Sequence, residues 1–461
     1  MPTASEIMAE FVENLNFENI PSDVINKVKL HIIDTIGIIL GVYNEDYSQG
    51  IVDFARMFKG SPTSTILAYM EKVFTPAAAL ANSTMAHSID YDDTHFGSLT
   101  HPSSVIIPTA LAVAEALKSS GKKLLESIVA GYEIVFRLGL IAPGALFHKG
   151  FHPTSVIGVF GAAAVAGKIF GFSKEQLVNA LGIAGSLSSG IYQATAEGIQ
   201  LKPLHPGFAS FNGILAAMLV QRGFKGPKKV FEGPQGFLRA YLNMESDYLF
   251  NQLSTLGKVW EIMNISIKPY PTCHSSHSSI EIAIKLKNEY GLTPEDIVEI
   301  TYYLPKVAIE DIVEPQDETY NPSTPYSARF SLPYLVITAL KKGWVGIWDF
   351  TYESISNPEI RKHMNKVKAV YEPKYDEYLA KGVVPAKARV LTKDGKVYEE
   401  EIIDHKGSPR NPMSLDDVIK KFKDNVSKNA YKEKSNEIIE KILSLEKIDN
   451  VEEFISIFKL P

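Results

Sequence analysis

Two segments built almost entirely of small and apolar residues constrain the fold of this chain more than any other feature. Residues 105–117 read VIIPTALAVAEAL, and residues 156–169 read VIGVFGAAAVAGKI. A helix that is apolar around its whole circumference has to be covered by protein on every side. The abundance of alanine and glycine also indicates helices that pack closely. We therefore expect the first part of the chain, to about residue 265, to be mostly helical.

The sequence pattern changes after about residue 266. Residues 297–304, IVEITYYL, are rich in β-branched and aromatic side chains and predict a strand. Residues 388–392 and 397–402 flank an Asp394-Gly395 pair, which is typical of a β-hairpin turn. These residues predict a second domain that mixes helices and strands.

Helix-capping signals mark two further helices. Ser173 and Gln176 have the spacing of a capping box and predict a helix that runs through LVNALGIAGSL. Ser414 is expected to cap another helix, with Asp416 and Asp417 in its first turn. We expect the tail from about residue 413 to be helical and to pack on the first domain.

Charge and cysteine content exclude several classes of function. The chain has 47 basic and 53 acidic residues, a net charge of −6, which gives no general electrostatic reason to bind nucleic acid or a membrane surface. Its single cysteine, Cys273, excludes an internal disulfide framework and an iron–sulfur cluster held by three or four cysteines of this chain. The start shows no secretory signal pattern, and the longest apolar stretch, residues 32–42, is too short to span a bilayer. A cytoplasmic protein is expected.

Eight of the 11 histidines lie between His87 and His277. The stretch HSIDYDDTH at residues 87–95, followed by His101-Pro102-Ser103, combines three carboxylates with three imidazoles. This combination suits proton transfer, because an aspartate fixes the tautomer and orientation of a histidine. Two other interpretations stay open: a solvated turn followed by a helix cap, and a metal site, since both residue types are ligands of zinc or iron.

Four later segments carry further candidate groups. His152 precedes an apolar helix, where free backbone N–H groups suit a carboxylate, and Lys202 in KPLHPG offers a point charge for an anion. The stretch KPYPTCHSSH, residues 268–277, lies at the expected domain junction, and Tyr334 follows in ARFSLPY. Ordinary alternatives are a capped helix, a solvent-exposed lysine and aromatic packing. The usual motifs of nucleotide-dependent enzymes and serine hydrolases are missing from the sequence.

Taken together and in this order, the segments resemble the family of 2-methylcitrate dehydratase and cis-aconitate decarboxylase, also called the MmgE/PrpD family. The resemblance runs from about residue 80 to 415. The stretches that carry it are AHSIDYDDTHFGSLTHPSSVIIPTALAVAEA, GFHPTSVIGVFGAAAVAGK, LKPLHPGFASFNGILAAM, IKPYPTCHSSHSSIEIAI, ARFSLPYLVITAL and GSPRNPMS.

The resemblance implies a mainly α protein with a second α+β domain. A large helical domain would comprise residues 1–266 and 406–461, and a smaller α+β lid would comprise residues 267–405. It also implies a homodimer, a small tricarboxylate as substrate, and catalysis without a metal or an organic cofactor.

When the family's motifs are matched to this sequence, the resemblance implies eight site residues. The catalytic candidates are Asp90, His101 and His152; the substrate-binding candidates are Thr94, Lys202, Lys268, His274 and Tyr334. His274 stands where family members often have arginine, so the preferred acid or the local charge would differ.

The leading hypothesis is dehydration of 2-methylcitrate to 2-methylaconitate by general acid–base catalysis. His101, oriented by Asp90, and His152 would share the roles of base and acid, while the lysines neutralise carboxylates. The alternatives are decarboxylation of cis-aconitate to itaconate, epimerisation or isomerisation of a related polycarboxylate, and a non-catalytic family member.

Overall fold

The computed structural model describes residues 2–58, 60–61, 63–197, 199–379 and 382–460. It divides into two compact units. The helical unit comprises Met1–Ser88, Asp92–Ile265 and Leu415–Pro461, and the mixed unit comprises Ile89–Tyr91 and Ser266–Ser414. The predicted fold class, mainly α with a second α+β part, is confirmed.

The helical unit also holds a short antiparallel hairpin, β1 (Ser64–Ile66) and β2 (Glu71–Val73). Its α-helices are α1 (Ala4–Asn14), α2 (Ser22–Val42), α3 (Asp46–Arg56), α4 (Thr75–His87), α5 (Ser103–Ala116), α6 (Gly121–Gly139), α7 (Ala145–His148), α8 (Pro153–Ile169), α9 (Lys174–Leu187), α10 (Gln193–Ala196), α11 (Leu204–Gln221), α12 (Asp247–Leu253), α21 (Leu415–Asn425), α22 (Ser435–Leu443) and α23 (Val451–Ser456). None of the helices described in the structure combines the length and apolar character needed to cross a bilayer.

The two small-residue segments form the centre of the helical unit, as predicted. Every residue of α8 is buried, and so are residues 103–115 of α5. Glycines bring α6 and α8 together: a Cβ on Gly161 would lie 3.0 Å from the carbonyl oxygen of Gly131, and a Cβ on Gly131 would lie 2.4 Å from Val165. This close packing fixes the N-terminus of α8, where His152 lies.

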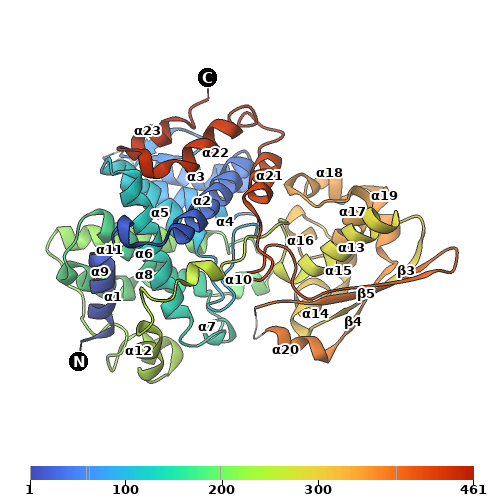
Figure 1. The fold of residues 1–461 in the computed structure, drawn as a ribbon, viewed down its shortest axis with the longest axis horizontal. Coiled ribbons are helices and arrows are strands. Elements are labelled where there is room, and N and C mark those ends of the chain that lie inside the picture. The colour runs from blue at the N-terminus through green and yellow to red at the C-terminus, as the bar shows by residue number, and fades with distance from the viewer. Residues whose placement is uncertain (1, 59, 62, 198, 380–381, 461) are drawn as a thin grey trace. The chain divides into compact units, whose positions relative to one another are not determined.

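The C-terminal tail is helical and belongs to the helical unit, where α21 packs against α2 (Figure 1). Lys421 of α21 forms a buried ion pair with Asp34 of α2, with 2.6 Å between Nζ and Oδ1. Next to this pair, a Cβ on Gly37 would lie 2.7 Å from the ring of Phe422. A charge interaction and a close approach of backbone thus join the tail to the first third of the chain.

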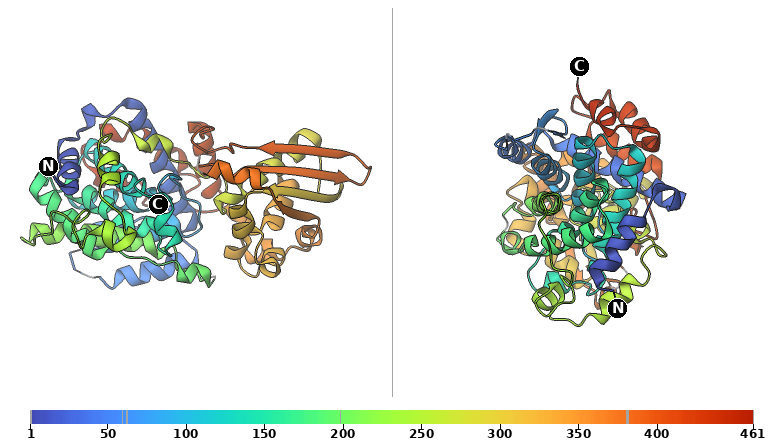
Figure 2. Two further views of the ribbon diagram at one scale, coloured as in Figure 1. Left: turned by 90° about the horizontal axis from the view of Figure 1, so that it is seen from below. Right: turned by 90° about the vertical axis from the view of Figure 1, so that its left-hand side faces the viewer.

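The mixed unit is built on a four-stranded sheet in the order β4-β3-β5-β6, in which β3 and β4 are parallel and the other pairs are antiparallel. Helices α13 and α17 pack on the sheet, and Figure 2 shows helices gathered on one of its faces. Gly395 has a φ of 81° in the β5–β6 turn, which explains why Asp-Gly predicts this hairpin. The elements are α13 (His277–Tyr290), β3 (Ile297–Leu304), α14 (Lys306–Ile312), α15 (Gln316–Tyr320), α16 (Pro325–Ala328), α17 (Leu332–Lys342), α18 (Tyr352–Ile355), α19 (Pro358–Met364), β4 (Val367–Tyr371), α20 (Asp376–Leu379), β5 (Ala386–Thr392) and β6 (Val397–Ile402).

A three-residue excursion of the chain, Ile89–Tyr91, belongs to the mixed unit although both of its neighbours belong to the helical unit. The Tyr91 hydroxyl donates a hydrogen bond to the carbonyl oxygen of Pro269, at 2.9 Å. Asp90 has a φ of 54°, in the left-handed region that aspartate tolerates better than most residues. The sequence analysis did not predict this excursion, and the role of the mixed unit as a lid stays a prediction.

Candidate active site

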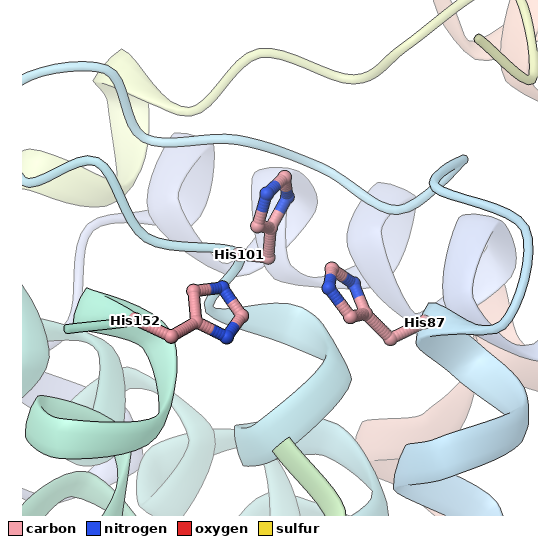
Figure 3. Close-up of side chains that lie close together, drawn as sticks. All are labelled: His87, His101 and His152. Carbon is pink, nitrogen blue, oxygen red and sulfur yellow. The ribbon is translucent and has the colours of Figure 1, made fainter. Parts of the chain in front are cut away.

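Three histidines from distant parts of the sequence meet in the helical unit (Figure 3). His87 is the last residue of α4, His101 precedes α5 by two residues, and His152 caps the N-terminus of α8. Their ring centroids are 4.7 Å apart for His87 and His101, 5.7 Å for His87 and His152, and 6.2 Å for His101 and His152. The structure thus places two predicted catalytic residues, His101 and His152, side by side.

His87 is oriented by a carboxylate. Its Nδ1 lies 2.8 Å from both carboxylate oxygens of Asp92, so Nδ1–H donates to that group. Its Nε2 is buried and makes no hydrogen bond with a described residue. The Asp92 contact therefore fixes the ring so that Nε2 is the nitrogen available for chemistry.

His101 is held by the loop that precedes α5. Its Nδ1–H donates to the backbone carbonyl of Asp93 at 2.9 Å, with Thr94 Oγ1 at 3.3 Å and an Asp92 carboxylate oxygen at 3.9 Å. Its backbone N–H donates to Thr154 Oγ1, at 3.0 Å, in the first turn of α8. Within the helical unit, Asp92, Asp93 and Thr94 thus orient His101, and the predicted contribution of Asp90 stays a prediction.

Asp93 connects the loop before α5 to the neighbouring helices. Its carboxylate accepts hydrogen bonds from the backbone N–H and hydroxyl of Ser103 at the start of α5, and it lies 2.5 Å from His31 Nδ1. The Tyr132 hydroxyl contacts the same serine. Asp93 is fully buried, so this network makes the position of His101 depend on α2, α5 and α6.

His152 is fully buried and pairs with a fourth histidine, His205 of α11, with 3.0 Å between their Nδ1 atoms. Burial lowers the pKa of His152 well below its usual value, and the positive charges of Lys202, His87, His205 and His101 lower it further. Burial, His87 and Lys202 lower the pKa of His205 to about 4. Both rings are therefore neutral near pH 7, and one Nδ1–H donates to the other Nδ1.

The remaining predicted residues of the helical unit lie around this cluster. Lys202 is partly buried two residues before α11, and its charge acts on both His152 and His205. Thr94 is buried beside His101. The helical unit therefore gathers Thr94, His101, His152 and Lys202 in one place.

Asp90 and Lys268 form a buried ion pair in the mixed unit, with 2.9 Å between Nζ and Oδ2. The ammonium group also donates to the carbonyl oxygens of Asp90, at 2.8 Å, and of Thr272, at 3.4 Å. These three acceptors match the three N–H groups of a lysine. The geometry favours a lysine that positions Asp90, and its direct contact with a substrate stays a prediction.

His274 and Tyr334 also lie in the mixed unit. The Nε2 atoms of His274 and His405 are 2.7 Å apart. The Tyr334 hydroxyl donates to the backbone carbonyl of Asp349, and burial raises the pKa of this phenol, so it stays protonated. Substrate contacts of both residues stay predictions.

Two histidine groups have a donor set that suits a transition metal: His87, His101 and His152 in the helical unit, and His274, His277 and His405 in the mixed unit. In each group the candidate ligand atoms lie within 4.8 Å of one another. Neutral imidazoles are ligands of zinc and related ions. The expectation that catalysis needs no metal therefore requires a direct test.

Sequence reasoning missed several residues around the cluster. His87, Asp92, Asp93 and His205 all stand inside the motifs that drew attention to the site. The spacing of His87 and Asp92, a helix end followed by a tight turn, was the available signal for their pairing. Which carboxylate of the stretch DYDD faces which imidazole depends on the backbone conformation at Asp90.

Comparison with known families covers nearly the whole chain. The MmgE/PrpD N-terminal domain matches residues 6–248, and the MmgE/PrpD C-terminal domain matches residues 270–447. The chain belongs to the MmgE/PrpD family. The predicted resemblance is thereby confirmed.

Several relatives align with this chain over nearly their whole length. The chain is 29% identical to the cis-aconitate decarboxylase of Homo sapiens, in an alignment that covers 100% of this chain and 95% of the relative. It is 28% identical to the mouse (Mus musculus) cis-aconitate decarboxylase, over 100% of this chain and 94% of the relative. The cis-aconitate decarboxylase of Aspergillus terreus is 24% identical, over 98% of this chain and 95% of the relative.

Proposed function

We propose that this protein is a lyase that acts on a small tricarboxylate by general acid–base catalysis. The observation that carries the proposal is the group of imidazoles formed by His87, His101 and His152, of which the first and last are buried, with Asp92 and Lys202 beside it. Imidazoles move protons near neutral pH, and a lysine charge attracts carboxylates.

In this proposal His152 is the base. A base needs a free electron pair, and the lowered pKa of His152 keeps its ring neutral at pH 7. A bound tricarboxylate brings negative charge to the cluster, which stabilises the imidazolium and raises the basicity of His152 when the proton has to move. The neutral ring thus becomes a stronger base once substrate is present.

His101 is the acid in this proposal. Its Nδ1–H is held by the Asp93 carbonyl, so Nε2 carries the transferable proton of the imidazolium. The Asp92 carboxylate, 3.9 Å away, favours that charged form. His87, bound to the same aspartate, supplies a third ring, whose Nε2–H donates to a substrate carboxylate in the imidazolium form.

Two reactions fit these roles. Decarboxylation of cis-aconitate breaks a carbon–carbon bond, releases CO₂ and leaves a carbanion, which His101 protonates to give itaconate. Dehydration of 2-methylcitrate removes a carbon-bound proton to His152 and releases hydroxide, which His101 protonates to water. The names of the relatives favour the first reaction, and the second would use both proposed roles, those of His152 and His101.

Separate incubations with cis-aconitate, 2-methylcitrate and citrate distinguish these reactions. Release of CO₂ with formation of itaconate identifies the decarboxylase, and a rise in alkene absorbance without CO₂ identifies the dehydratase. Absence of turnover with all three acids would contradict the proposal. The homodimer implied by the resemblance is checked on the same preparation by analytical ultracentrifugation.

Replacing Lys202 by alanine is expected to raise KM for the tricarboxylate with a smaller change in kcat. The lysine charge attracts carboxylates in both the ground state and the transition state, so its loss removes uniform binding. Steady-state kinetics measure the two constants. Lys225→Ala, at an exposed position of the same unit, is the control and should leave both unchanged; a Lys202→Ala enzyme with normal KM and low kcat would contradict the assignment.

As the pH is lowered, kcat/KM is expected to decline only below the usual pKa range of histidine. His152 has to be neutral to act as the base, and its lowered pKa keeps it neutral as pH falls below 6.5. Measurement of kcat/KM, which reports groups of the free enzyme, tests this. A loss of kcat/KM that begins at pH 6.5 or above as the pH is lowered would contradict it.

A further inference from the structure

A second group of buried histidines lies in the mixed unit, and it includes His274, which the resemblance also implies as a substrate-binding residue. His274 lies in the short helix His274–Ser276, His277 begins α13, and His405 follows β6 by three residues. The rings of His274 and His277 stack at 4.6 Å, and the ring of His405 lies 4.6 Å from His274 and 5.2 Å from His277. Two imidazoles near the start of α13 and one from a distant segment thus bring ring nitrogens within 4.8 Å of one another.

The segment that carries His405 is held firmly. The Nδ1–H of His405 donates to the carbonyl oxygen of Lys406 at 2.8 Å. The backbone N–H of Lys406 donates to Glu281 of α13, also at 2.8 Å. At Gly407, whose φ is 89°, a Cβ would lie 2.1 Å from the carbonyl oxygen of Ile267. The fixed tautomer of His405 leaves the Nε2 electron pair directed into the group, the arrangement found in metal-binding histidines.

His277 is the deepest member of the group. It is fully buried, and the backbone of Thr272 lies close enough to its ring to favour the protonated form. Burial lowers the pKa of His277 well below its usual value, and that of His405 to about 4. Both rings are therefore neutral at pH 7, which is the form that binds metal ions.

We propose that His274, His277 and His405 bind one divalent ion of the zinc class, which joins the start of α13 to the segment after β6. Three imidazoles without a carboxylate suit zinc or cobalt better than magnesium or calcium. In a tetrahedral site with zinc–nitrogen bonds of about 2.0–2.1 Å, two ligand nitrogens lie about 3.3 Å apart. Binding therefore increases the distance between Nε2 of His274 and Nε2 of His405, now 2.7 Å, by roughly half an ångström. A water molecule or small anion takes the fourth position on the ion.

Groups near the three rings have opposite effects on the protonation of the histidines. The Lys268 ammonium disfavours positive charge at His277, while Asp90 and the Thr272 backbone favour it, and Asp404 favours it at His405. Because Lys268 is paired with Asp90, the charge of this lysine is largely balanced. The proposed ion stabilises the fold and takes no part in the acid–base steps, and it departs from the sequence-based expectation of no metal.

Metal analysis of untagged, full-length protein tests the proposal. After incubation with zinc and removal of excess ion, we expect one zinc per chain, and cobalt substitution should give the visible absorption bands of a tetrahedral site. His277→Ala and His405→Gln should lose the ion and the zinc-dependent rise in melting temperature. His148→Ala, at an exposed position of the helical unit, and His87→Ala should keep both.

Two results would overturn the proposal. The first is wild-type protein that binds no zinc or cobalt above background, which would leave a simple hydrogen bond between His274 and His405. The second is an ion retained in folded His277→Ala and His405→Gln but lost in His87→Ala, which would place the metal in the helical unit. That second result would also contradict metal-free acid–base catalysis, whereas the first would leave the proposed function intact. If the His277 and His405 variants fail to fold, one zinc retained by His87→Ala supports the proposal, and loss of the ion from that variant contradicts it.

Discussion

Replacing His101 by alanine is expected to lower kcat by about 10²–10⁴-fold, the usual contribution of a general acid or base. The ring lies 4.7 Å from His87 and 6.2 Å from His152, and in the proposed mechanism it delivers the proton in either reaction. Because the group acts when the proton moves, KM should change much less than kcat. Steady-state kinetics with the active tricarboxylate, on protein shown to be folded by circular dichroism, measure both effects.

Two further variants make this result specific. His148→Ala removes a surface histidine from the end of α7 and should keep full activity. Asp92→Asn keeps the size of the side chain but removes the charge that faces His87 and His101, so it should lower kcat and shift the pH–rate profile. Near-normal turnover of His101→Ala would remove this histidine from the mechanism.

Replacing Lys421 by methionine is expected to lower the free energy of unfolding by about 3–5 kcal/mol, the usual cost of removing one partner of a buried ion pair. Lys421 and Asp34 join α21 to α2, and both side chains are 1% exposed. Burial raises the pKa of Asp34 to about 7 even beside the lysine. Without Lys421 that pKa rises further, so the folded state binds a proton that the unfolded state has lost. The destabilisation should therefore be greater at pH 8 than at pH 6.

Urea denaturation at the two pH values measures this effect. The double variant Asp34→Leu/Lys421→Met removes both charges and should recover much of the stability. Lys362→Met removes the lysine of an exposed pair with Glu359 in α19 and should have little effect. A Lys421→Met protein as stable as wild type at pH 8 would show that the ion pair contributes no net stability.

Local patterns predicted much of the fold. The helices around residues 105–117 and 156–169, the capping box at Ser173, the strand at residues 297–304 and the hairpin at Gly395 are all present. Each depends on the periodicity or backbone preference of a few adjacent residues. The parallel pairing of β3 with β4 and the excursion Ile89–Tyr91 depend on contacts between distant residues, which a single sequence does not reveal.

At the candidate site, too, local sequence patterns were informative, whereas contacts between distant residues were not predicted. Histidines beside proline at helix starts were recognised as candidates, and the structure brings His101 and His152 together. The choice of Asp90 as the residue that orients His101 came from the family motif, and it stays a prediction. A positive φ at Asp90 and its ion pair with Lys268 place that carboxylate in the mixed unit, while Asp92 and Asp93 hold the imidazoles.

The excursion Ile89–Tyr91 affects how the protein can be dissected. Because the mixed unit consists of two separate stretches of chain, cutting the gene at residues 266 and 414 does not isolate it. Such a fragment would have a buried Lys268 without the Asp90 carboxylate, and a Pro269 carbonyl without the Tyr91 hydroxyl. A domain exchange between relatives therefore has to transfer residues 89–91 together with residues 266–414, or the transplanted unit will contain an unpaired buried cation.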